Sequence, residues 1–86
     1  MIEVIIEKSR ASKLYQLVEG SEKPSGLAPQ AQFVFYAMAM LDRPATPEEI
    51  GSKCEEIAGW KSKQPSARIV QYYIPTLNKL GLIIKQ

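Results

Sequence analysis

Apolar residues recur at two spacings along the chain, and the change of spacing separates strands from helices. Residues 2–7 alternate imperfectly between apolar and acidic side chains and are rich in β-branched residues, which favours a strand. Residues 14–18 fit either a strand or a helical i, i+3, i+4 stripe. We favour the strand, so that residues 2–18 form a hairpin. The tip of that hairpin is basic and carries Lys8, Arg10 and Lys13.

Helical spacing begins after a polar connector at residues 19–28. Pro29 stands near the first position of a helix that runs to Leu41, where a missing backbone N–H costs little. The main apolar stripe of this helix consists of Phe33, Val34, Ala37, Met38 and Leu41. Three further apolar residues lie off the stripe: Phe35, Tyr36 and Met40. Because the helix is apolar almost all round, we expect it at the centre of the fold or at an oligomer interface.

The second helix has the clearest start signal. Thr46-Pro-Glu-Glu49 has the form of a capping box, in which the threonine hydroxyl accepts from the N–H of Glu49 and the Glu49 carboxylate reaches back. Apolar residues then follow on one face from Ile50 to Ala58, and Gly59 is expected to end the helix.

A third helix is predicted over residues 65–80, with Gln64 or Ser62 as its cap. Its inward side is predicted to carry Ile69, Val70, Tyr73, Leu77 and Leu80. Pro75 removes one backbone hydrogen bond inside this helix, so we expect a bend there. Gly81 ends the helix, and residues 82–85 are typical of a strand that can pair with residues 2–7.

The composition fits a single domain over residues 1–86, with an N-terminal strand or hairpin at 1–20 and the helices and terminal strand at 29–86. A core this small gives modest stability, which a homodimer would raise. One cysteine, Cys54, and no histidine exclude a disulfide framework and a cysteine-based zinc site, and fit a reducing cytoplasm. The acidic residues near the start argue against a signal peptide, and no apolar run is long enough for a membrane span.

Charge is distributed unevenly along the chain. Residues 1–58 hold nine acidic and six basic residues, a net charge of −3, whereas residues 59–86 hold five basic and no acidic residues, a net charge of +5. A one-sign block of this kind favours a polyanionic partner.

The third helix combines this charge with a suitable shape for duplex DNA. The major groove accepts one α-helix that has an apolar back, a polar front and a neighbouring helix to fix its angle. The candidate DNA-binding residues on the front and in the loop before it are Lys61, Lys63, Gln64, Ser66, Arg68, Gln71 and Tyr72.

Three stretches together resemble the winged helix-turn-helix domains of prokaryotic and viral regulators: Gln30–Leu41, Ala45–Cys54 and Ser66–Ile83. The resemblance implies an α+β fold with a three-helix winged helix-turn-helix core and a small antiparallel sheet from the N-terminal and C-terminal strands. It implies a dimeric, DNA-binding transcription regulator.

The chain departs from the resembled pattern in three ways. No return strand for the wing follows residue 85, the link between the second and third helices is longer than the simplest turn, and Pro75 interrupts the third helix. The missing wing strand, the modest net charge and the very apolar first helix leave a second interpretation open, a winged-helix protein-interaction module that does not bind DNA.

Catalysis is not expected. The usual general base, histidine, is absent. The sequence contains neither a phosphate-cradling glycine loop nor metal-ligand spacing, so no cofactor, metal or small-molecule substrate is predicted.

Overall fold

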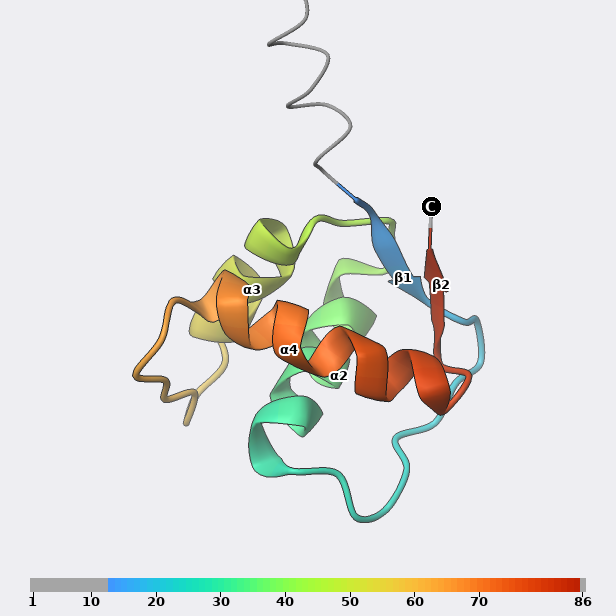
Figure 1. Cartoon of the computed structure of the whole chain (residues 1–86), viewed down its shortest axis with the longest axis horizontal. Helices are drawn as coiled ribbons and strands as arrows, with labels where there is room; N and C mark the ends of the chain where they lie inside the picture. Colours follow the sequence, from blue (N-terminus) through green and yellow to red (C-terminus); the bar gives the residue numbers. More distant parts are fainter. Residues whose placement is uncertain (1–12, 86) are drawn as a thin grey trace, which may run out of the picture.

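Two short strands bracket three helices in the computed structural model of this protein, which describes residues 13–85 (Figure 1). The elements are β1 (Tyr15–Leu17), α2 (Pro29–Leu41), α3 (Pro47–Glu55), α4 (Ser66–Lys79) and β2 (Ile83–Lys85). The predicted α+β class, with three helices and a small antiparallel sheet, is confirmed at this level. The strand predicted at residues 2–7 lies outside the described residues, as do Lys8 and Arg10 of the predicted basic tip, whereas its third residue, Lys13, is described and exposed.

The sheet joins the two ends of the described chain. β1 pairs with β2 in antiparallel register, with Tyr15 opposite Lys85 and Leu17 opposite Ile83. On its other side, Tyr15 exchanges two backbone hydrogen bonds of 2.8 and 3.0 Å with Ala45, in the link between α2 and α3. The strand favoured for residues 14–18 is therefore confirmed over Tyr15–Leu17. β1 lies between β2 and the α2–α3 link.

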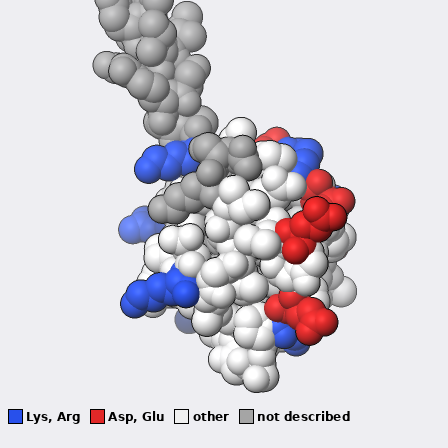
Figure 2. Space-filling view, turned by 90° about the vertical axis from the view of Figure 1, so that its right-hand side faces the viewer, with Lys and Arg blue, Asp and Glu red and all other residues white. Residues whose placement is uncertain are grey.

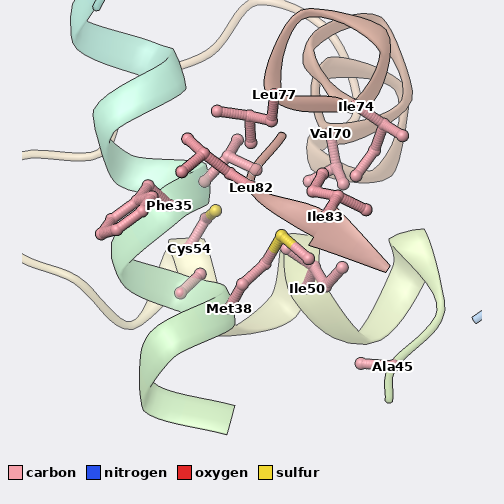
Figure 3. Close-up of a cluster of buried hydrophobic side chains, with 12 residues drawn as sticks. Phe35, Met38, Ala45, Ile50, Cys54, Val70, Ile74, Leu77, Leu82 and Ile83 are labelled. Carbon is pink, nitrogen blue, oxygen red and sulfur yellow. The ribbon is translucent and has the colours of Figure 1, made fainter. Parts of the chain in front are cut away.

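All three helices and β2 contribute side chains to one core (Figure 3). Its members include Val34, Phe35, Ala37, Met38, Ile50, Cys54, Val70, Ile74, Leu77, Leu82 and Ile83. Two predictions of which side chains face the core were wrong. Phe35 was placed off the main apolar stripe of α2 but is buried. Leu80 was placed on the inward side of α4 but is 50% exposed, and Ile74 is buried instead. The buried side of α4 is therefore centred on Val70, Ile74 and Leu77.

The capping box of α3 is confirmed. The Glu49 N–H donates to the Thr46 hydroxyl (3.2 Å), and the Thr46 N–H donates to the Glu49 carboxylate (2.9 Å). That backbone hydrogen bond, with a further contribution from Arg43, lowers the pKa of Glu49 below its ordinary value. The helix ends at Glu55, four residues before the predicted end at Gly59, and a turn follows.

The N-terminus of α4 differs from the prediction. Its cap is Pro65, with no side-chain hydrogen bond. Instead of capping the helix, Ser62 bonds to the backbone of Gln64 within the loop. The helix continues through Pro75, which is exposed, to Lys79. Among residues 13–85, no helix combines the length and apolar character needed to cross a membrane.

Candidate nucleic-acid interface

The solvent-facing side of α4 is polar and basic. Because successive helical residues turn by about 100°, the residues opposite Val70 and Leu77 are exposed. We call this set the α4 outer face: Arg68, Gln71, Tyr72, Pro75, Thr76 and Lys79. Tyr72 is 73% exposed and leans edge-on against Tyr73, with ring centroids 4.9 Å apart. The outer face therefore offers two cations, one amide and one aromatic ring to a partner.

Cations and anions are segregated on the molecule. In Figure 2, one edge of the view carries Lys and Arg side chains alone, whereas the opposite edge carries the Asp and Glu side chains with some Lys or Arg side chains among them. The basic edge corresponds to the front of Figure 1, where α4 lies. The ion pairs between described residues join Arg43 to Glu49 and Lys53 to Glu56, and neither pair includes a residue of α4. Neither α4 nor the loop at residues 57–65 contains an acidic residue, so no neighbour in sequence neutralises the outer face.

The loop before α4 presents Lys61, Lys63 and Gln64 to solvent. Its backbone is held in place, because the Gln30 side chain donates to the Lys61 carbonyl at 3.1 Å. The Trp60 ring also packs edge-on against Phe33, with centroids 5.6 Å apart. These three candidate residues therefore lie on a fixed loop beside the first turn of α4.

Ser66, another candidate for DNA binding, is buried with only 8% of its surface exposed. Its hydroxyl donates to the Glu55 carboxylate at 2.7 Å and accepts from the Trp60 indole N–H at 3.1 Å. Ser66 therefore links the end of α3, the loop and the start of α4, and we remove it from the interface. The i, i+4, i+8 spacing of Ser66, Val70 and Ile74 is the sequence signal that places it on the buried side.

α4 rests directly on the backbone of α3. A Cβ atom at Gly51 would lie 2.8 Å from the Ala67 nitrogen and 2.9 Å from the Ser66 carbonyl carbon. Both distances are too short for any side chain, so glycine at this position allows the first turn of α4 to approach α3. The position of the α4 N-terminus depends on this contact and on the Ser66 hydrogen bonds.

A groove runs between β1 and the C-terminal half of α4. It has a volume of about 320 Å³ and is lined by Tyr15, Gln71, Ile74, Pro75, Asn78 and Lys79. Of these residues, the sequence predicts a DNA contact only for Gln71. The spacing of Arg68 and Lys79, three helical turns apart on one face, was the available signal for Lys79. Nothing in the sequence indicated that Tyr15 would lie opposite α4.

The solvent-facing side of α2 has a different character. Tyr36 is 43% exposed and Met40 is 59% exposed. With the partly buried Phe33 they form a stripe on a helix that contains no charged residue. We call these three residues the α2 outer face. A cation lies beside the stripe, since the Lys23 ammonium is 5.5 Å from the centre of the Tyr36 ring.

The described part of the chain contains one cysteine, Cys54. No group of three or more His, Cys, Asp and Glu residues within it could hold a metal ion. Burial raises the pKa of the Cys54 thiol to about 11, and the thiol lies 3.7 Å from the Phe33 carbonyl. Cys54 is therefore a protonated core residue at neutral pH.

No protein-family model, curated protein sequence or solved structure matches this chain. Function is therefore inferred from geometry and charge alone.

Proposed function

We propose that this protein binds duplex DNA through the α4 outer face and acts as a transcription regulator. The observation that carries the proposal is an exposed helix face with Arg68, Gln71 and Tyr72 at its centre, on a helix that contains no acidic residue. A helix of this kind fits the major groove, which is about 12 Å wide. The neighbouring helix α3 supports it through Gly51, as a reading helix requires.

The arrangement of strands supports a winged-helix type of domain. A hairpin wing would require a strand that pairs with β2. In this protein β1 supplies that partner from before the helices, and pairs with β2 in antiparallel register. The side of β1 away from β2 contacts Ala45 between α2 and α3. The small sheet thus joins three separate parts of the chain beside the C-terminal end of α4.

The proposed contacts are of two kinds, to base edges and to phosphates. Arg68 can donate two hydrogen bonds to a guanine edge, and Gln71 can both donate to and accept from an adenine edge. Lys61 and Lys63, on the loop before the helix, are suited to phosphate oxygens, which fix the orientation without reading sequence. Gln64 and Tyr72 lie beside these groups and complete the proposed contact set.

The test is duplex binding across a salt series, measured by fluorescence anisotropy with the full chain. If Z phosphates are contacted, the logarithm of the association constant should fall with the logarithm of salt concentration with a slope of about −0.9Z. Arg68→Ala should weaken binding by about 1–3 kcal/mol. Arg43→Ala is the matched control, because Arg43 pairs with Glu49 and belongs neither to α4 nor to the loop before it. No retention on any duplex at low salt would remove the proposal.

A second candidate function is docking of a protein on the α2 outer face. The exposed Tyr36 and Met40 on an uncharged helix favour it, because aromatic and methionine side chains are enriched where proteins meet. In the DNA-binding proposal the same surface is available for the predicted homodimer. Light scattering of the chain with and without duplex measures both the mass of the free protein and its stoichiometry on DNA.

A further inference from the structure

We infer that the groove between β1 and α4 holds a phosphate of the DNA backbone. The inference rests on the proposed function, since it assigns a second contact to the same DNA. It concerns Tyr15 and Asn78, which lie outside the α4 outer face, and Lys79, which belongs to that face but has no contact assigned to it above.

The groove is lined by hydrogen-bond donors from two elements. Lys79 and Asn78, in the last turn of α4, and Tyr15, in β1, all line it and all have side chains that can donate. No acidic residue lines the groove. Lys79 makes no ion pair with any other described residue, and both it and Asn78 are exposed. Exposed hydrogen-bond donors that have no acidic partner are suited to bind an anionic oxygen.

The backbone carbonyl of Gln71, a residue that also lines the groove, limits where that oxygen can bind. Pro75 has no backbone N–H, so the Gln71 carbonyl lacks its helical donor. A phosphate oxygen gains nothing from a carbonyl oxygen. The phosphate is therefore expected at the Lys79 and Asn78 end of the groove. The Gln71 carbonyl remains available to water or to a sugar or base donor.

The spacing of cations along α4 supports two phosphate contacts rather than one. Lys61 and Lys63 precede the helix, and Lys79 ends it. Fourteen helical residues span about 21 Å, which exceeds the roughly 12 Å width of the major groove. A helix lying in the groove can thus bring one basic end to each bordering backbone, with Gln71 and Tyr72 between them over the bases.

Lys79→Ala in the full chain tests the inference, with binding measured on two duplexes of unrelated sequence over a salt series. Loss of one phosphate contact should reduce the salt slope by about one and weaken binding roughly tenfold at 0.1 M salt, by the same factor on both duplexes. Lys79→Arg should restore most of the affinity. Tyr15→Phe and Asn78→Ala should produce smaller losses that are also independent of sequence.

Lys23→Ala is the matched control, because it removes the same charge from beside the α2 outer face. If the wild type binds duplex but Lys79→Ala changes the slope no more than Lys23→Ala, the groove assignment is wrong and the proposed function stands. If the wild type shows no duplex binding at low salt, the proposed function and the groove assignment both fail. Thermal unfolding followed by circular dichroism checks that each variant remains folded.

Discussion

Helices α2 and α4 contribute to the same core but present opposite chemistry to solvent. α2 buries Val34, Phe35 and Met38, and α4 buries Val70, Ile74 and Leu77. Outside the core, the α2 outer face is apolar and α2 has no charged residue at all. The α4 outer face carries Arg68 and Lys79 with no acid between them.

The difference shows that the need to bury apolar side chains determines the residue types on the inner side of each helix only. An apolar inner side is required of both for the domain to fold, whereas the outer sides are free to differ. A cationic, hydrogen-bonding outer side suits a polyanion, and an aromatic and thioether outer side suits another protein. Because the two faces belong to separate helices, substitutions can change one and leave the other intact.

The largest effect is expected from Gly51→Ala, which acts on α4. The added methyl group would meet the backbone at Ser66 and Ala67, so the first turn of α4 must shift away from α3. Overpacking of this kind costs about 1–3 kcal/mol of unfolding free energy. We expect a lower urea midpoint and, in the folded fraction, weaker duplex binding, measured by circular dichroism and anisotropy.

Ser52→Ala is the control for this substitution, since Ser52 is the next residue of α3 and is exposed. It should leave both the urea midpoint and duplex affinity close to wild type. If Gly51→Ala were to lower stability but preserve affinity fully, the placement of α4 on α3 would not govern binding.

The strength of local signals explains which elements could be predicted. Thr46 and Glu49 are three residues apart and determine the start of α3 by hydrogen bonds to each other, so the sequence alone predicted the capping box. The exposed side of α4 was predicted at Arg68, Gln71 and Tyr72, because polar and apolar residues alternate clearly with helical period in that helix. In α2, almost every residue is apolar, so periodicity could not tell that Phe35 rather than Phe33 is fully buried.

The missed features depend on contacts between distant segments. Tyr15 bonds to Ala45 and pairs opposite Lys85, but a three-residue strand carries no sequence signal for its partner. The groove that Tyr15 forms with α4 was missed for the same reason. Ser66 was assigned to the surface because it is polar. Its burial depends on Glu55 and Trp60, which satisfy its hydroxyl.

An intermediate effect is expected from a substitution of Thr46, the N-cap residue of α3. Helix α3 contacts both α2 and α4. Thr46→Ala removes the cap and should cost about 1 kcal/mol of unfolding free energy without altering duplex affinity in the folded protein. The measurement is the urea midpoint, with Ser52→Ala again as the control. A loss of affinity larger than the loss of folded protein would contradict this separation.

The same cap predicts a pH dependence. Because the folded protein lowers the pKa of Glu49 below its ordinary value of 4.5, the ionised carboxylate stabilises the fold above that pH. This contribution is lost as pH falls through the lowered pKa. The difference in urea midpoint between wild type and Glu49→Gln should therefore be present at pH 7 and shrink below pH 4.5. An equal difference at pH 7 and pH 3 would contradict it.

The smallest effect is expected from Met40→Lys, which places a cation on the α2 outer face. Met40 is 59% exposed, so unfolding free energy should change by no more than about 0.5 kcal/mol. If DNA contacts only the α4 side, the new charge should leave the salt slope of duplex binding unchanged, even though net charge rises. Thr76→Lys is the matched variant on the α4 outer face, and there the same charge should steepen the slope. Equal slopes for the two variants would mean that net charge, rather than the face that carries it, governs binding, and the contrast between α2 and α4 would lose its functional meaning.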